Sequence, residues 1–352
     1  MAKILISLVS EQTIPNVLFI REMNGVEKYI FVSTDQMERK GKTEMIISGS
    51  HIKGVPFQKI EVSEDSLEDI AKKLDDLKFD DDDEFIVNLT GGTKIMSIGV
   101  YNFFTSRRAD IYYLPIGKNI YKRIFSHRVF DLGFRISLND YLTSYGINVI
   151  HKGKLQKDKG YTCDFFTRFI NNRIDPKLID ELRKRRGRKI KKDDITGLEA
   201  FLRDIRFDTE ELEFIGKREI DYLTGGWFEE YVFATVKDKL HLKDDKIGFN
   251  IHISRDNTQN EFDVMFVCEN ALYVIECKTS LNSTSLLNAL YKLSALKKDF
   301  GLWVKSYLFT LDDLRDSNGN IKEVYEKRAS LLGIKLVDRV ILKDKKEING
   351  IF

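Results

Sequence analysis

Few cysteines and no long apolar run occur in this sequence of 352 residues, and both absences narrow its class. Its three cysteines (Cys163, Cys268 and Cys277) form an odd set without metal-site spacing, which fits a reducing cytoplasm. The first residues, MAKILISLV, lack the length and flanks of a signal peptide, and no apolar run approaches a membrane span. We therefore expect a soluble, cytoplasmic protein with no membrane partner.

The sequence also lacks an excess of one charge, because 57 lysines and arginines stand against 55 aspartates and glutamates. Net charge thus says little about partners, and local clusters must be read instead. The densest cluster is residues 183–192, with eight basic residues in ten. It is either a solvated loop or a segment that binds phosphate backbones without sequence preference. The length allows two or three domains, each with its own core.

Strands and helices alternate in the first third of the chain, which predicts a parallel, doubly wound sheet. We expect strands at 3–9, 29–33, 57–62, 84–89 and 110–115, with helices at 66–77 and 93–106. In such sheets, ligands bind beyond the carboxyl ends of the strands, where the strand order reverses. The loops after the first and fourth strands, 10–16 and 88–94, are therefore the expected ligand loops.

The second of these loops, NLTGGTK, has features of an anion site. Gly91 and Gly92 allow close backbone approach, and the helix that follows offers free N–H groups. Side-chain donors are added by Asn88, Thr90, Thr93 and Lys94. The loop is neither a P-loop nor a dinucleotide fingerprint, so a plain helix-capping turn is the alternative reading.

Residues 260–278 form the other informative stretch, which reads as two strands joined by a turn at Glu269-Asn270. A turn of two or four residues makes Asp263 the cross-strand partner of Glu276, with Cβ atoms roughly 5 Å apart. Lys278 shares their face by the strand period of two. Paired carboxylates repel unless a cation lies between them, and oxygen-rich pairs suit Mg²⁺ or Mn²⁺. An ordinary polar hairpin, whose lysine pairs with an acid, is the alternative.

Asp263 followed by Glu276-Cys277-Lys278 resembles the D…(D/E)-x-K core of restriction-endonuclease-like nucleases, PD-(D/E)xK. The resemblance implies that Asp263 and Glu276 hold the metal, helped by a backbone carbonyl near Cys277, and that Lys278 positions the attacking water. That superfamily usually adds an acid from a preceding helix. In the helix expected at 225–240, Glu229 continues an apolar stripe, whereas Glu230 falls on a mostly solvent-facing row. We therefore expect Glu229 to support the metal or the water. After the hairpin we expect a helix at 283–298 and strands at 302–308 and 339–342.

The NxTGGTKxM pattern that begins at Asn88 closely resembles the ligand loop of CRISPR-associated Rossmann-fold (CARF) sensor domains, and residues 9–16 are similar to their first loop. In that family a cyclic oligoadenylate binds across the axis of a homodimer. The resemblance covers roughly residues 1–140. It implies an activator site made by Ser10, Glu11, Gln12, Asn88, Thr90, Gly91, Gly92, Thr93 and Lys94.

Together, the two resemblances imply a metal-dependent nuclease of type III CRISPR antiviral defence. Cyclic oligoadenylate, most simply the cyclic tetra-adenylate on a two-fold axis, would activate it to cleave DNA, RNA or both. The expected fold is a Rossmann-like CARF domain (1–140), a basic middle segment (141–220) and a restriction-endonuclease-like α/β domain (221–352). One alternative is a ligand-sensing transcription regulator, or a nucleic-acid-binding protein with an inactive nuclease fold. Another is a sensor that cleaves its own ring with Ser10, Thr90 and Lys94, although its loops contain no histidine.

Overall fold

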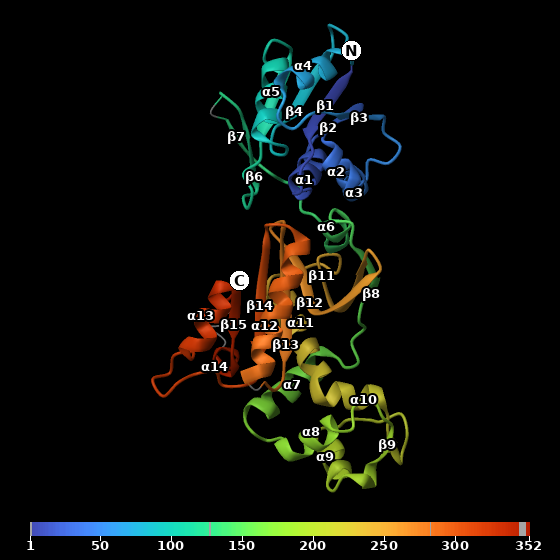
Figure 1. Cartoon of the computed structure of the whole chain (residues 1–352). Coiled ribbons are helices and arrows are strands. Elements are labelled where there is room, and N and C mark those ends of the chain that lie inside the picture. Colours follow the sequence, from blue (N-terminus) through green and yellow to red (C-terminus); the bar gives the residue numbers. More distant parts are fainter. Residues whose placement is uncertain (1, 127, 282, 345–349) are drawn as a thin grey trace.

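The computed structural model describes residues 2–126, 128–281, 283–344 and 350–352, and within them two large sheets follow one another along the molecule, in addition to a two-stranded ribbon (Figure 1). Within these ranges no helix combines the length and the hydrophobicity that crossing a bilayer would require. The fold is α/β in both halves, as the alternating pattern predicts.

The first sheet has the strand order β3-β2-β1-β4-β5-β6-β7. Its strands are β1 (Lys3–Leu8), β2 (Lys28–Ser33), β3 (Phe57–Glu61), β4 (Glu84–Asn88), β5 (Ala109–Tyr113), β6 (Ile120–Arg123) and β7 (Val129–Asp131). The strands from β3 to β5 are parallel, and β6 and β7 add an antiparallel edge. The order reverses between β1 and β4, so the loops after these strands lie side by side, as the sequence predicts.

Helices cover both faces of this sheet, and their bounds follow from local capping. They are α1 (Ile14–Glu22), α2 (Asp35–Arg39), α3 (Lys42–Ser50), α4 (Leu67–Asp75) and α5 (Lys94–Thr105). The side chain of Ser66 accepts the Asp69 N–H at the start of α4, and that of Thr93 accepts the Met96 N–H at the start of α5. One apolar cluster packs α4 and α5 against the sheet, and another packs α1 and α3 on the opposite face.

The second sheet has the order β15-β14-β13-β12-β11-β8. Its strands are β8 (Asn148–His151), β11 (Ile247–Arg255), β12 (Thr258–Cys268), β13 (Ala271–Lys278), β14 (Val304–Thr310) and β15 (Ile334–Val337). The strands from β8 to β13 are antiparallel, and β13, β14 and β15 are parallel. The helices of this half are α6 (Leu138–Thr143), α11 (Trp227–Lys239), α12 (Ser283–Lys297), α13 (Glu323–Leu331) and α14 (Arg339–Lys343), with a 3₁₀ turn, η3 (Lys298–Phe300). The 141–220 segment contributes β8 to this sheet.

The strand expected at 339–342 is wrong, because these residues form helix α14 and the edge strand is β15. The side chain of Asp338 accepts the Ile341 N–H and so starts the helix. A polar N-cap thus prevails over the β-branched and apolar residues that follow it.

A small helical lobe precedes α11 (Figure 1). It comprises α7 (Lys159–Ile170), α8 (Pro176–Arg183), β9 (Ile190–Lys191), η1 (Lys192–Asp194), α9 (Leu198–Asp204), β10 (Phe214–Ile215), α10 (Lys217–Asp221) and the π-turn η2 (Tyr222–Gly226). Asp175 caps α8, whose apolar residues Leu178, Ile179 and Leu182 are buried. The lobe shares one apolar cluster with α11 and the second sheet.

The two sheets are joined by a continuous apolar core rather than by a loose linker. One cluster contains Phe19 of α1, Tyr141 of α6 and Phe262 of β12. Polar contacts reinforce it, because the Lys246 ammonium donates to the carbonyls of Arg135 and Ile136 at 2.7 and 2.8 Å. Packed side chains therefore connect the two halves directly.

Candidate active site and ligand loops

The hairpin of β12 and β13 is closed by a tight turn at Glu269 and Asn270. Both residues are left-handed, with φ of 49° and 61°, as in the type I′ turn that matches the twist of the strands. Cross-strand pairs run from Cys268 and Ala271 to Val264 and Ile275. Continued by one residue, this register sets Asp263 beside Glu276, as the sequence predicts.

Asp263, Glu276 and Lys278 meet on one face of the hairpin. The two carboxylates are only 7% and 5% exposed. The Lys278 Nζ lies 2.6 Å from Glu276 Oε1 and 3.6 Å from Asp263 Oδ2. The N–H of Cys277 donates to Asp263 Oδ2 at 2.6 Å, so this carboxylate takes the place of a ladder acceptor. Cys277 itself is buried, with its side chain in the core.

Burial and mutual repulsion perturb these groups strongly. Desolvation, and then the charge of Glu276, raise the pKa of Asp263 to about 6. Desolvation opposes the charge of Lys278, but the two carboxylates outweigh it and raise the pKa of that ammonium. The lysine therefore remains charged and partly neutralises the pair.

Glu229 approaches the same cluster from α11. Burial, and then the charge of Asp263, raise its pKa to about 8. The structure thus brings the four residues that the sequence selected, Glu229, Asp263, Glu276 and Lys278, into one electrostatic group. Perturbed acids that share a recess are frequent at catalytic sites.

The expectation that Glu230 faces solvent is wrong. Its side chain is 2% exposed, and its carboxylate accepts the N–H groups of Gln156 at 2.6 Å and Lys157 at 3.5 Å. The α11 helix is covered on one side by the sheet and on the other by α7, where Phe166 stacks on Tyr231 with ring centroids 3.9 Å apart. Helical periodicity identified the sheet-facing side but could not reveal the second layer.

The donors in this cluster fit a hard divalent cation. Mg²⁺ and Mn²⁺ take carboxylate and carbonyl oxygens and keep several waters. Over the described residues, no three His, Cys, Asp or Glu side chains gather in the arrangement of a metal cluster. The protein would therefore supply the two carboxylates of Asp263 and Glu276 and the main chain at Cys277. Water and phosphate oxygens would complete the coordination.

In the first sheet, Asn88 and Thr90 shape the loop that follows β4. Asn88 is fully buried, and its amide donates to Ser7 Oγ at 3.3 Å and Asn16 Oδ1 at 3.0 Å. Its Oδ1 accepts the Thr90 hydroxyl at 2.6 Å. The Thr90 hydroxyl in turn accepts the Leu114 N–H at 2.8 Å. These side chains are occupied within the protein, which does not favour a reacting hydroxyl at Thr90.

The remaining residues of this loop, from Gly91 to Lys94, present main-chain groups and the exposed side chain of Lys94. A Cβ on Gly91 would lie 2.1 Å from the carbonyl oxygen of Leu8, so the loop passes close over the end of β1. Gly92 has a φ of 70°, which favours glycine. Thr93 caps α5 and also donates to the Glu64 carbonyl at 2.7 Å. Lys94 is exposed at the start of the helix, where an anion is stabilised.

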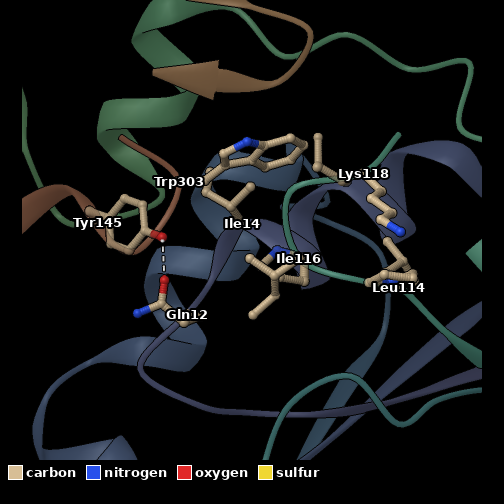
Figure 2. Close-up of a pocket in the computed structure, with 10 residues that line it drawn as sticks. Gln12, Ile14, Leu114, Ile116, Lys118, Tyr145 and Trp303 are labelled. Carbon is tan, nitrogen blue, oxygen red and sulfur yellow. Dashed lines mark hydrogen bonds between the residues drawn. The ribbon is translucent and has the colours of Figure 1, made fainter. Parts of the chain in front are cut away.

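The neighbouring loop after β1 contacts both halves of the molecule. The Ser10 hydroxyl donates to the Gln12 carbonyl at 3.3 Å, and Glu11 pairs with Lys42 at 3.1 Å. Gln12 Oε1 accepts the Tyr145 hydroxyl at 3.2 Å and the Leu302 N–H at 2.9 Å. Figure 2 shows Gln12 and Tyr145 at a small pocket that Trp303 also lines. At about 20 Å³ this pocket holds little more than one water, so it is too small for a nucleotide.

A second contact between the halves holds the turn of the β12–β13 hairpin. Asn119, between β5 and β6, donates to Glu269 Oε2 at 2.6 Å and accepts the Asn270 amide at 2.9 Å. The Oδ1 of Asn270 accepts the Ile136 N–H at 2.9 Å, and Arg135 pairs with Glu269 at 2.8 Å. Sequence reasoning found neither this contact nor that of Gln12, because both join residues more than 130 positions apart.

The basic segment 183–192 is largely paired within the protein. Arg183 pairs with Asp180 at 2.7 Å, and Lys184 and Arg185 each pair with Glu181 at 2.7 Å. The Arg186 Nε donates to Thr224 Oγ1 at 2.5 Å, Lys189 pairs with Glu211 at 2.5 Å, and Lys192 donates to the Leu212 carbonyl at 2.6 Å. These contacts favour the solvated reading over a dedicated phosphate footprint.

Comparisons with solved structures give the same fold over the whole chain. Can2 from Sulfobacillus thermosulfidooxidans, solved with cyclic tetra-adenylate, is 20% identical with a TM-score of 0.77, and the match covers 99% of this chain and 98% of that one. VC1899 from Vibrio cholerae is 19% identical with a TM-score of 0.78 and the same coverage. A type III CRISPR defence DNA nuclease activated by cyclic oligoadenylate is 17% identical with a TM-score of 0.57 over 94% of this chain and 52% of its own.

No curated protein sequence matches the chain. Two family models do match, and together they cover more than half of it. Residues 4–141 match the Card1 CARF domain, and residues 216–348 match the Card1-like endonuclease domain. The chain therefore belongs to the CARF nucleases in which a Card1 CARF domain precedes a Card1-like endonuclease domain.

Proposed function

We propose that this protein is a metal-dependent endonuclease of type III CRISPR antiviral defence, switched on by a cyclic oligoadenylate and cleaving phosphodiester bonds in DNA, RNA or both. The observation that carries the proposal is the buried Asp263–Glu276–Lys278 cluster, faced by Glu229, inside a Card1-like endonuclease domain. Cyclic tetra-adenylate is the favoured activator, because Can2, which shares the fold, was solved with it.

Each residue of the cluster has a chemical role that its surroundings support. A bound Mg²⁺ or Mn²⁺ would neutralise phosphate charge and lower the pKa of water, and Asp263, Glu276 and the main chain at Cys277 would hold it. Lys278, kept charged by its neighbours, donates to a water or to the oxygens on which charge develops. Glu229, whose pKa is about 8 without a cation, can give or receive a proton near neutral pH.

The activator would bind at a distance from this cluster, on the loops after β1 and β4. Lys94 and the first N–H groups of α5 suit its phosphates, and Ser10, Glu11 and Gln12 border the same edge. A ring lying on the two-fold axis of a homodimer contacts both protomers and so favours one arrangement of the dimer. Gln12 and Asn119 are the side chains through which such a change would reach the endonuclease half.

A cleavage assay tests this function directly. Labelled single- and double-stranded DNA and RNA are incubated with the protein, with Mg²⁺, Mn²⁺ or EDTA, and with no activator or cyclic tri-, tetra- or hexa-adenylate. We expect cleavage that needs both a divalent cation and one ring size. Glu276→Ala should abolish it while keeping the fold, and Lys278→Ala should abolish it with cation binding retained.

Glu213 is exposed in the helical lobe that precedes α11 and is not part of the cluster, so Glu213→Gln is the matched control and should cut normally. Full activity of Glu276→Ala, or full activity in EDTA, would disprove the assigned metal chemistry.

A further inference from the structure

A cleft lined by basic side chains opens beside Glu229. It has a volume of about 770 Å³, within the range of ligand-binding pockets. Its basic lining comes from the end of β8, from the residues that follow it and from the start of α10: His151, Lys152, Lys154, Lys217 and Arg218. We propose that this cleft binds the sugar-phosphate backbone of the substrate and leads it to the catalytic cluster. The inference rests on the proposed nuclease function and adds to it the path of the substrate.

The wall formed by residues 152–154 is built against β11. The Gly153 N–H donates to the Phe249 carbonyl at 2.9 Å. A Cβ on Gly153 would lie 2.9 Å from the Cβ of Asn250 and 2.9 Å from the Phe249 ring, so only glycine allows this approach. This contact fixes the main chain at Gly153, so the neighbouring residues Lys152 and Lys154 are held along the cleft and do not lie on a free loop.

The cations of the cleft are available for a ligand. Lys154, Lys217 and Arg218 are exposed, and in the part of the chain that the structure describes none of them has a side-chain hydrogen bond or ion pair. The opposite holds for the 183–192 segment, where Arg183, Lys184, Arg185 and Lys189 are paired with acids. Of the two basic features, the cleft is therefore the better phosphate site.

Acidic groups in the cleft do not cancel this charge. The carboxylate of Glu230 is occupied by the N–H groups of Gln156 and Lys157. Glu229 lines the cleft and also belongs to the electrostatic cluster of Asp263, Glu276 and Lys278. Asp221 is the remaining acid of the lining. A chain of phosphates that passed Lys154, Lys217 and Arg218 would thus reach Glu229, the residue that the cleft shares with the cluster.

Phosphate chemistry is shared by DNA, RNA and the cyclic activator, so the test includes all three. In a Glu276→Ala background, which binds substrate without cutting it, Lys154, Lys217 and Arg218 are replaced together by serine. The matched control replaces Lys184, Arg188 and Lys191, which are also exposed cations of the same half. Affinity for labelled DNA, labelled RNA and cyclic tetra-adenylate is measured by fluorescence and calorimetry over a range of salt.

We expect the cleft variant to lose affinity for the nucleic acid that the enzyme cuts. Its plot of log affinity against log salt should flatten by about 0.7 to 0.9 for each lost phosphate contact, so by about 2 to 3 in all if each of the three cations makes one contact. The control should keep the parental slope, and both variants should bind the cyclic activator equally well. Thermal melting verifies that both are folded.

The proposal would be overturned if the cleft variant kept the salt dependence of affinity of the Glu276→Ala protein. It would also be overturned if the control variant lost as much affinity for nucleic acid as the cleft variant. Loss of activator affinity in the cleft variant alone would reassign the cleft to the activator. Failure of the nuclease function looks different: the unmutated protein, given activator and cation, would cut no DNA or RNA. If it cuts and the cleft variant with Glu276 restored cuts at the same kcat/KM, only the path of the substrate is wrong.

Discussion

Replacing Glu229 by glutamine should stabilise the cation-free protein, and the gain should grow with pH. Burial and the charge of Asp263 raise the pKa of Glu229 from 4.5 to about 8 in the folded protein. A carboxyl with a raised pKa opposes folding when it must ionise. The cost is absent below pH 4.5, increases between pH 4.5 and 8, and is constant above pH 8. The neutral amide never ionises, so it avoids this cost.

The size of the effect follows from the shift. A change from 4.5 to about 8 corresponds to at most about 5 kcal/mol at pH 8, because one pKa unit is about 1.4 kcal/mol. Relaxation of the protein and entry of water around the ionised carboxylate reduce this, so we expect about 2 kcal/mol at pH 8 and less than about 0.5 kcal/mol at pH 5. For a domain of this size, the gain at pH 8 corresponds to a Tm increase of about 5 °C.

The assay is thermal unfolding in EDTA at several pH values from 5 to 8, with Glu229→Gln and the wild type side by side. Glu213→Gln, an exposed change in the helical lobe, serves as the control and should shift Tm little at any pH. The reasoning would be refuted by a Glu229→Gln protein no more stable than the wild type at pH 8. It would also be refuted by a gain of equal size at pH 5 and pH 8.

Two further predictions concern activation. Lys94→Ala should raise the activator concentration needed for half-maximal cleavage, while the rate at saturation is largely kept. The reason is that Lys94 is exposed at the ligand loop and belongs to the other half of the molecule from the hairpin. A titration with cyclic tetra-adenylate that leaves the midpoint unchanged would contradict this prediction. Asn119→Ala should leave activator affinity intact in calorimetry but reduce the ratio of activated to basal cleavage rate. The reason is that this substitution removes the hydrogen bonds that hold the turn at Glu269 and Asn270. An unchanged ratio would exclude this contact as a route of coupling.

Local patterns in the sequence predicted the elements that local physics determines. The period of two in 260–278, with a two-residue turn, was enough to place Asp263 beside Glu276 and to put Lys278 on the same face. Sequence could not reveal that α11 is covered on both sides, which is why Glu230 was misplaced. It also could not show that Asn88 is consumed in its own loop, since the partners Ser7 and Asn16 come from other elements.

The docked turn makes the β12–β13 hairpin a stiff connection between the CARF half and the carboxylates, because β11 and β14 pair with its two strands. Asn270, which is hydrogen-bonded to the CARF half, lies at one end of this connection. Glu276 lies six residues further along β13, which is about 20 Å away at roughly 3.3 Å per residue. A tilt of about 5° at the turn would therefore displace the carboxylate by nearly 2 Å. A misplacement of about 1 Å can already reduce the rate of an enzyme a hundredfold. If the activator shifts the CARF half, we therefore expect the sheet that holds this hairpin to carry a slight rotation of the turn to the carboxylates without refolding.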